Sequence, residues 1–295
     1  MKLSELFAQN KPTLSFEVFP PKTSDTYDAV KFATEHIAAL SPDYMSVTYG
    51  AGGGTSEFTV SIAANLLKTY GVTPLAHLTC LSSTKDGIIR QLKALRENGI
   101  ENILALRGDL PKDADANAKR EYRYATQLIE DIKANGDFCI GAACYPEGHV
   151  ESASCAEDIL HLKEKVDAGC DFLTTQMFFD NNILYRFLYK IREAGITVPI
   201  VAGIMPVTNA KQIKRICELS GTYLPQRFKS IVDRFGDNPN AMKQAGIAYA
   251  TEQIIDLLAN GVNAIHIYSM NKPEVAEQIQ NSLSEIIPKR TAKND

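Results

Sequence analysis

The sequence predicts an α/β fold, a single (β/α)8 TIM barrel, and three observations favour it. Eight short β-rich runs alternate with amphipathic helical stretches along the 295 residues. Six of the seven steps between strand starts have the length of one βα unit, roughly 30 residues. No linker rich in Pro, Gly or Ser divides the chain, so residues 1–295 are expected to form one domain. The structural alternative is a doubly wound sheet with helices on both faces.

The strands are expected where β-branched and aromatic residues gather between turn residues. They are Thr13–Phe19, Asp43–Tyr49, Pro74–Cys80, Asn102–Arg107, Phe138–Cys144, Asp171–Met177, Pro199–Met205 and Asn263–Tyr268. Helices are expected between them, for example at Thr26–Leu40, Lys85–Asn98, Glu151–Ala168 and Asn182–Ala194. Several of these stretches end in Asn-Gly or Ala-Gly, the usual helix stop. The step between strands seven and eight is much longer than the others and predicts an extra helical segment near Leu224–Phe235.

Composition excludes several classes of protein. Hydrophobic residues make up 45% of the chain and charged residues 22%, so it can bury a large core and is not a disordered protein. The net charge of −4 comes with no basic stripe, which argues against nucleic acid or a membrane surface as a partner. No run approaches a membrane span, and the start lacks the apolar stretch of a signal peptide. Six cysteines without Cys-x-x-Cys spacing indicate reduced thiols, hence a cytoplasmic protein with no metal site.

Polar residues recur on one face of the expected strands. Because side chains alternate along a strand, Ser15 and Glu17 oppose Leu14, Phe16 and Val18 in the first one. The polar members on the other strands are Ser46, Thr48, His77, Thr79, Arg107, Asp109, Thr174, Gln176, His266 and Tyr268. We expect this face to line the barrel and reach its carboxyl-terminal rim, with opposing apolar residues such as Leu106 under the helices. The alternatives are a solvated edge strand or an interior filled by hydrogen-bonded polar groups.

Glu17 is the residue that most strongly suggests chemistry. It lies between aromatic neighbours at a strand end, where poor solvation should raise the pKa of its carboxyl group. Such a carboxyl group suits a general acid near neutral pH. A structural ion pair inside the barrel explains the residue equally well.

Two glycine-containing loops follow strands and could meet a ligand. Gly108 would allow a ligand close to the backbone, Arg107 could hold a phosphate or a planar ring, and Asp109 could stabilise a developing cation. The same residues also fit an ordinary turn. Residues 50–55 resemble a dinucleotide fingerprint, but Thr55 stands where the third glycine belongs. We interpret them as a rim loop with exposed N–H groups rather than a Rossmann motif.

One helix face beyond the fifth strand carries spaced polar groups. Asp158, His161 and Lys165 stand at i, i+3 and i+7 of the expected helix. The carboxylate could bind ribose hydroxyls and the lysine a phosphate, as an adenosine diphosphate group would require. An exposed charged helix face is the alternative.

Seven sequence blocks carry a family resemblance. They are residues 15–22, 47–51, 76–80, 104–111, 175–180, 203–207 and 266–271, including Ser-Phe-Glu-Val-Phe-Pro-Pro and Arg-Gly-Asp-Leu-Pro. Together they resemble the bacterial methylenetetrahydrofolate reductase family over nearly the whole chain. The resemblance implies a barrel that binds FAD without a Rossmann fold and reduces 5,10-methylenetetrahydrofolate to 5-methyltetrahydrofolate with NADH or NADPH. It further implies ping-pong kinetics, a role in methionine synthesis and a homo-oligomer, with no regulatory domain and no S-adenosylmethionine control.

The resemblance also implies roles for individual residues. Glu17 would be the general acid that protonates the departing nitrogen, and Asp109 would stabilise the resulting iminium ion. The implied substrate contacts are Glu17, Asp109, Gln176, Gln212 and Lys272. The implied FAD contacts are Thr48, Tyr49, Ala51, His77, Arg107, Gly108, Asp109, Tyr124, Ala125, Tyr145, His149, Asp158, His161 and Lys165.

Three positions depart from the family pattern. His161 stands where asparagine is expected, Glu164 where a basic residue is common, and Ile216 where an aromatic residue is expected. The choice between NADH and NADPH therefore stays open.

Two other functions remain to be distinguished. A barrel lyase or aldolase needs an inward-facing lysine, and none of the expected strands carries one in its interior. A flavin- or folate-binding protein without catalysis would have no need of a proton donor at Glu17.

Overall fold

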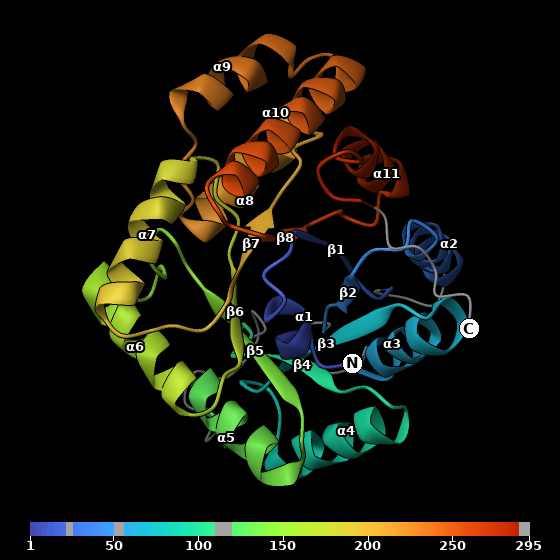
Figure 1. Cartoon of the computed structure of the whole chain (residues 1–295), viewed down its shortest axis with the longest axis vertical. Coiled ribbons are helices and arrows are strands. Elements are labelled where there is room, and N and C mark those ends of the chain that lie inside the picture. Colours follow the sequence, from blue (N-terminus) through green and yellow to red (C-terminus); the bar gives the residue numbers. More distant parts are fainter. Residues whose placement is uncertain (22–25, 50–55, 110–119, 289–295) are drawn as a thin grey trace.

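Eight parallel strands close into one barrel, with helices around its outside (Figure 1). The computed structural model describes residues 1–21, 26–49, 56–109 and 120–288. The strands are β1 (Thr13–Val18), β2 (Tyr44–Val47), β3 (Thr73–Thr79), β4 (Asn102–Leu106), β5 (Cys139–Cys144), β6 (Phe172–Thr175), β7 (Ile200–Ile204) and β8 (Ala264–Ile267). Each strand pairs with its neighbours in the sequence, and β8 pairs with β1. The predicted barrel is confirmed, and the doubly wound sheet is excluded.

The helices of the outer ring follow the strands in order. They are α2 (Tyr27–Ala38), α3 (Ser56–Tyr70), α4 (Lys85–Glu97), α5 (Ala125–Asn135), α6 (Cys155–Asp167), α7 (Asn181–Glu193), α8 (Ala210–Ser220), α9 (Gln226–Phe235), α10 (Pro239–Ala259) and α11 (Pro273–Ser282). Polar caps start several of them: the side chains of Thr84, Ser154 and Asp180 accept hydrogen bonds from first-turn N–H groups. The predicted extra segment between β7 and β8 is confirmed, and α9 forms its centre.

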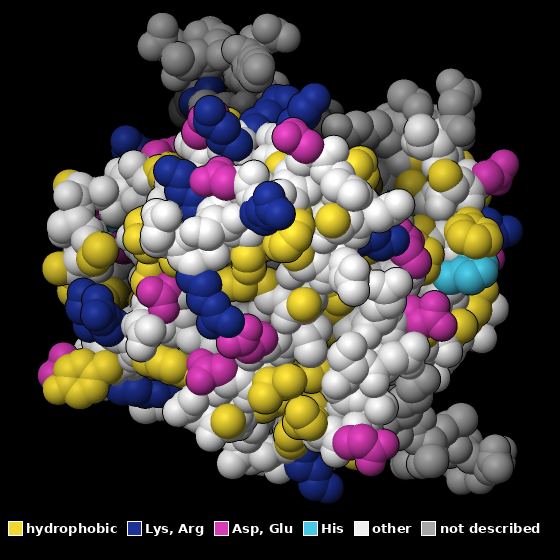
Figure 2. Space-filling model, turned by 90° about the horizontal axis from the view of Figure 1, so that it is seen from above, with side chains coloured by type: hydrophobic (Ala, Val, Ile, Leu, Met, Phe, Trp, Pro, Cys, Tyr) yellow, Lys and Arg dark blue, Asp and Glu magenta, His cyan; other side chains and the backbone are white. Residues whose placement is uncertain are grey.

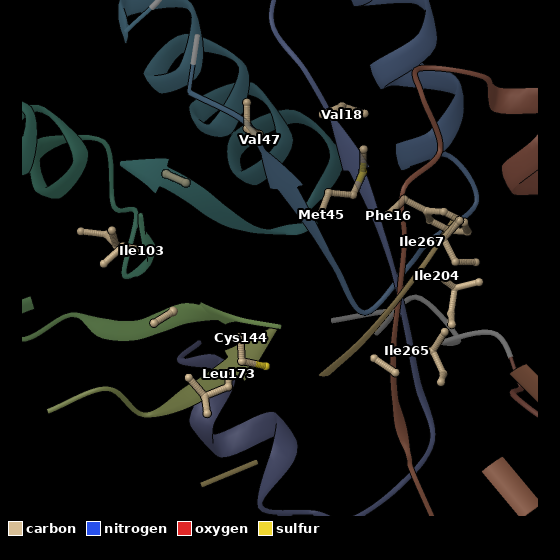
Figure 3. Packing of buried hydrophobic residues seen from close by; sticks show 14 of the residues in the cluster. Phe16, Val18, Met45, Val47, Ile103, Cys144, Leu173, Ile204, Ile265 and Ile267 are labelled. Atoms are coloured by element: carbon tan, nitrogen blue, oxygen red, sulfur yellow. The ribbon is translucent and has the colours of Figure 1, made fainter. Parts of the chain in front are cut away.

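The sheet separates two hydrophobic clusters. Outward-facing side chains such as Phe16, Met45 and Ile267 pack under the helices (Figure 3). Inward-facing side chains form an interior cluster that includes Tyr44 and Phe172. Alternation along each strand therefore builds two cores from one sheet.

A short helix that the sequence analysis did not predict closes the amino-terminal end of the barrel. In α1 (Leu3–Phe7), Leu3 and Leu6 are buried in the interior cluster. The ring of Phe7 packs edge-on against Phe172, with 5.1 Å between ring centroids. The N–H of Leu3 donates to Oδ1 of Asn102 at 2.8 Å, which fixes the helix to the start of β4.

The fourth strand corrects one prediction. Leu104 and Leu106 belong to the interior cluster, whereas Ile103 and Ala105 face the helices. The prediction that Leu106 packs under the helices was wrong, because Leu106 packs against the interior cluster. β4 ends at Leu106 and the chain then leaves the extended conformation, since Gly108 has φ of +79°. The alternation rule does not carry past the strand end.

The surface mixes charges of both signs. On the face shown in Figure 2, Lys and Arg side chains are interspersed with Asp and Glu. This face therefore has no basic stripe of the kind that binds nucleic acid. The six cysteines are unpaired, and four of them are buried. Within the described ranges, no helix has the length and apolar character needed to cross a membrane.

We expect that α1, which closes the amino-terminal end of the barrel, stabilises the fold. Leu3 is fully buried, so Leu3→Ala removes several methyl groups from the closed end of the barrel. The free energy of unfolding should fall by about 2–5 kcal/mol in equilibrium urea unfolding. Leu219→Ala is the matched control, because that side chain is 71% exposed and its loss should cost less than about 0.5 kcal/mol. Equal effects for the two variants would show that α1 is dispensable.

Candidate active site

Glu17 points into the carboxyl-terminal mouth of the barrel, next to His77. Its side chain is 17% exposed, and its Oε2 lies 3.8 Å from Nε2 of His77 on β3. Burial raises the pKa of Glu17 to about 8 and lowers the pKa of His77 to about 3. At neutral pH the pair is therefore a carboxylic acid beside a neutral imidazole, not an ion pair.

Poor solvation raises the pKa of Glu17, as predicted, but its neighbour Phe16 is not the source. The flanking Phe16 faces the helices, so it does not desolvate the carboxyl group. Enclosure by the barrel does so instead. His77 is also poorly solvated, and its buried Nε2 has no hydrogen-bond partner among the residues that the structure describes. A donor or acceptor on a bound ligand would satisfy that nitrogen.

A hydrogen-bonded polar layer lies level with Ser15. Oγ of Ser15 donates to the carbonyl oxygen of Ile265 at 3.0 Å and lies 2.8 Å from Nδ1 of His266. Because that hydroxyl has one proton, Nδ1–H of His266 donates to Ser15, and Nε2 accepts from Oγ of Ser46 at 3.1 Å. The ring of Tyr44 stacks on His266 with 2° between the planes. For these residues, the alternative of an interior filled by paired polar groups is the correct one.

Tyr268 is a buried aromatic residue whose pKa responds to Glu17. Its hydroxyl donates to the carbonyl oxygen of Thr175 at 2.6 Å. A Cβ at Gly203 would lie 2.5 Å from that hydroxyl, so the ring can cross β7 only above a glycine. Burial raises the pKa of Tyr268 well above its ordinary value, and the charges of Glu17 and Tyr145 raise it further. Tyr268 is therefore an uncharged phenol at neutral pH.

A second cluster collects the charged residues that follow β4 and β5. Both guanidinium nitrogens of Arg107 bind the carboxylate of Glu151, at 2.5 and 2.7 Å. Tyr145 packs perpendicular to His149, with 4.6 Å between ring centroids. Burial raises the pKa of Tyr145 to about 12, with Arg107 opposing the shift. The cluster joins a planar cation to two aromatic rings.

The helix face predicted on α6 completes this second cluster. Nζ of Lys165 donates to the carbonyl oxygen of Ala143 at 3.0 Å, and burial lowers its pKa. Asp158 accepts a hydrogen bond from Ser152 at 3.2 Å. Charges on Asp158 and Lys165 act on His149, which places all three near one another. His161 instead stacks on Tyr124, the residue before α5, with 6.4 Å between ring centroids.

The remaining predicted FAD contacts follow strands or begin a helix: they are Thr48, Tyr49, Ala51, Gly108 and Ala125. Thr48 and Tyr49 follow β2, and the N–H of Thr48 donates to the carbonyl oxygen of Val18 at 3.0 Å. Gly108 packs closely on Thr79: an added Cβ would lie 2.9 Å from Cβ of that residue. Ala125 is buried at the start of α5. Ala51 lies outside the described residues.

The other substrate candidates are not gathered around Glu17. Nζ of Lys272 donates to Oγ1 of Thr208 at 2.6 Å. Oε1 of Gln176 accepts from the N–H of Met177 at 3.0 Å. Gln212 is exposed in the first turn of α8, and Asp109 is exposed beyond β4. No described contact joins these four side chains to the Glu17 carboxyl group.

Sequence reasoning missed Glu151, the partner of Arg107. The two residues lie 44 positions apart, so no local spacing signals the pair. The only available signal is an acidic residue two positions after His149 in a loop rich in candidates. Within the described part of the chain, no group of three or more His, Cys, Asp or Glu residues could hold a metal ion.

Comparison with known proteins matches most of the chain to one family. The family model for methylenetetrahydrofolate reductase matches residues 2–284. The 5,10-methylenetetrahydrofolate reductase of Escherichia coli (strain K12) is 36% identical over 275 residues, which is 93% of this chain and 92% of that protein. Methylenetetrahydrofolate reductase (NADH) 1 of Arabidopsis thaliana is 36% identical over 283 residues, 92% of this chain and 48% of that protein. The chain spans about half the length of the plant relatives it matches.

A solved structure supports the fold. A Clostridium thermocellum protein described as binding two copies of 5-methyl-5,6,7,8-tetrahydrofolic acid superposes with a TM-score of 0.63. The alignment covers 97% of this chain and 100% of that one, at 15% sequence identity. At this identity the likeness concerns the barrel alone.

The buried acid predicts a pH dependence of stability. Glu17 binds its proton more tightly in the folded state, with a pKa of about 8 against 4.5, so its contribution is lost as pH rises through 8. His77 and His266, with pKa values lowered from 6.5 to about 3, have the opposite effect, but only below pH 6.5. Between pH 6.5 and 8 the free energy of unfolding of the wild-type protein should therefore fall by about 1–2 kcal/mol more than that of Glu17→Gln.

Urea unfolding at the two pH values checks this expectation. Glu97→Gln removes an exposed carboxyl group on α4 and is the matched control, which should follow the wild type. Parallel behaviour of Glu17→Gln and wild type would mean that Glu17 is ionised in the folded protein.

Proposed function

Because this chain belongs to the methylenetetrahydrofolate reductase family, we propose that it reduces 5,10-methylenetetrahydrofolate to 5-methyltetrahydrofolate, with FAD as cofactor and NADH or NADPH as electron donor. The observation that carries this proposal is the Glu17 carboxyl group, which burial at the barrel mouth keeps protonated near neutral pH. A binding protein has no use for such a group, whereas the reduction requires a proton donor.

Glu17 is proposed to act as the general acid. The methylene carbon accepts a hydride only after its bridge opens to an iminium ion, and opening puts a developing negative charge on the departing nitrogen. A carboxylic acid with a pKa of about 8 is protonated at pH 7 and is matched to this transfer. His77 is neutral at this pH, so it does not compete as a cation and does not draw the proton from Glu17.

The second cluster fits a flavin nucleotide. Its donor set combines an ammonium and a guanidinium group for phosphates, a carboxylate for ribose hydroxyls and aromatic rings for planar groups. The proposed FAD contacts in it are Arg107, Tyr145, His149, Asp158 and Lys165, with Tyr124 and His161 beside them. The unpartnered Nε2 of His77 offers one more polar contact.

When bound, FAD would supply the hydride, having taken it from the nicotinamide in a separate half-reaction. The chain's own contribution is to orient the folate, exclude water and deliver the proton. Asp109 is exposed at the end of β4, where its charge could stabilise the iminium ion. The proposed folate contacts are Gln176 after β6, Gln212 on α8 and Lys272 after β8.

The product and the thiols suggest the cellular setting. A methyl group on a reduced folate serves methyl transfer, and the family resemblance points to methionine synthesis. Six unpaired cysteines suit the reducing cytoplasm, where we propose that the protein acts as a homo-oligomer, as the family resemblance implies.

The proposal predicts that Glu17→Gln separates the two half-reactions. In an anaerobic spectral titration of the FAD-loaded protein, the variant should still lose its visible flavin band on adding NADH. Reoxidation by methylenetetrahydrofolate should be about 10²–10⁴-fold slower than in wild type, the usual contribution of a general acid. Glu97→Gln should behave as wild type in both steps.

Other results would redirect the proposal. Normal folate turnover by Glu17→Gln would remove the role of Glu17. A wild-type protein that stays colourless after FAD is supplied would remove the cofactor. Bound FAD without turnover would favour a flavin- or folate-binding protein, and a borohydride-trapped adduct with a carbonyl substrate would favour a barrel lyase.

A further inference from the structure

β1, the strand that carries Glu17, extends past the last of its residues that pairs with β8. The register between β1 and β8 runs from Thr13 opposite Ala264 to Phe16 opposite Ile267. Tyr268, the residue after β8, continues the pairing with β7 instead: its N–H donates to the carbonyl oxygen of Ile204 at 2.9 Å. The strand pairing thus stops one residue before Glu17 on that side.

Two side chains from the loop after β8 continue the hydrogen bonding where the strand pairing stops. Oγ of Ser269 donates to the carbonyl oxygen of Glu17 at 2.7 Å. The carboxamide of Asn271 makes two bonds to the backbone of Phe19: Nδ2 donates to its carbonyl oxygen and Oδ1 accepts from its N–H, both at 3.0 Å. Asn271 therefore pairs with Phe19 as a peptide group of a neighbouring strand would. These three bonds fix the backbone at Glu17 and two residues beyond it.

The loop adopts a costly backbone conformation to place these side chains. Met270 and Asn271 have φ of +55° and +53°, the left-handed region that side chains other than glycine rarely occupy. Two such residues in succession persist only where surrounding contacts determine them, and they occur most often at functional sites. On the other side, Lys272 binds Thr208 and ties the loop to the end of β7.

We propose that Asn271, together with Ser269, is a positioning residue for the proton donor: it holds the backbone around Glu17 so that the carboxyl group stays inside the barrel mouth. The inference rests on the proposed function, because it assigns Asn271 to the proton-transfer half of that reaction. Among the described contacts, the Asn271 side chain makes hydrogen bonds to the backbone of Phe19 and none to His77 or to the cluster around Arg107 and Tyr145. It therefore acts through Glu17 alone.

The expected consequence is a change in the solvation of Glu17. The titratable groups that act on it are His77 from β3 and Tyr268 just after β8, with His266 deeper in the barrel. None of these is a cation at neutral pH, so the state of Glu17 depends on how well water is excluded. Releasing the backbone should let the carboxyl group reach water and lower its pKa toward 4.5.

The test uses Asn271→Gly, because glycine keeps the positive φ while both bonds to Phe19 are lost. Asn263→Gly is the matched control: Asn263 makes comparable amide contacts to Asn10, but at the amino-terminal end of the barrel. Ser269→Ala removes the bond to Glu17, and Ser269→Thr should restore it.

The first readout needs no catalysis. In protein labelled with ¹³C at the glutamate side-chain carboxyl, the Glu17 resonance is the one missing from Glu17→Gln. Its pKa should fall by one unit or more in Asn271→Gly and Ser269→Ala, and stay unchanged in Asn263→Gly and Ser269→Thr.

The second readout separates this role from a structural one. At pH 7.5 the folate half-reaction should slow about threefold in Asn271→Gly if the pKa of Glu17 falls by one unit, and it should recover at pH 6, where Glu17 is protonated again. Flavin reduction by NADH should not change.

Two results would overturn the positioning role. One is an unchanged Glu17 pKa with an unchanged pH profile in Asn271→Gly, and the other is an equal shift in Asn263→Gly. If the pKa moves but no variant, wild type included, reduces the folate, the proposed function fails while the positioning of Glu17 stands.

Discussion

Pairing between the first and last strands is the interaction on which the rest of this structure depends. The β1–β8 register sets Ser15 opposite His266, and so brings residues 17–19 beside residues 268–271. In an open sheet Glu17 would sit on an edge strand in water, with an ordinary carboxylate. Closure encloses it, and enclosure is what raises its pKa to about 8. Chemistry at the barrel mouth is thus a consequence of topology, not of the residues next to Glu17 in the sequence.

The barrel interior is divided by depth. Apolar side chains and α1 fill the amino-terminal end, the hydrogen-bonded layer around His266 lies above them, and Glu17 with His77 lies at the mouth. The first layer supplies stability, and the second pairs Ser15, Ser46 and His266 with one another. In the third, Nε2 of His77 has no hydrogen-bond partner among the described residues, and neither have the deeper Thr13 and Tyr44 hydroxyls. An unpaired buried group is costly, so the place of His77 at the open end fits a site completed by a ligand.

Sequence reasoning succeeded where the signal was local and failed where it depended on the closed barrel. All eight strands and the Glu17 face follow from alternation and from turn residues, which act over a few positions. The five-residue α1 is too short to show a helical period, and nothing in its sequence says that a barrel end needs closing. Leu106 was assigned to the wrong face because it was set opposite Arg107 and Asp109, which lie past the end of β4. Glu151 and Asn271 act on residues far away in the chain, and only the fold brings those contacts into being.

The two clusters have opposing electrostatic needs, and the structure keeps them apart. A cation beside Glu17 would favour its carboxylate and remove the proton it is proposed to donate, whereas a phosphate site requires cations. Arg107 is matched by the carboxylate of Glu151, and Lys165 is held against the carbonyl oxygen of Ala143. Tyr268 is an uncharged phenol whose pKa burial raises further. Burial alone raises the pKa of Glu17 and no cation among the described residues acts on it, so the protonated acid is compatible with the phosphate site proposed at Arg107 and Lys165.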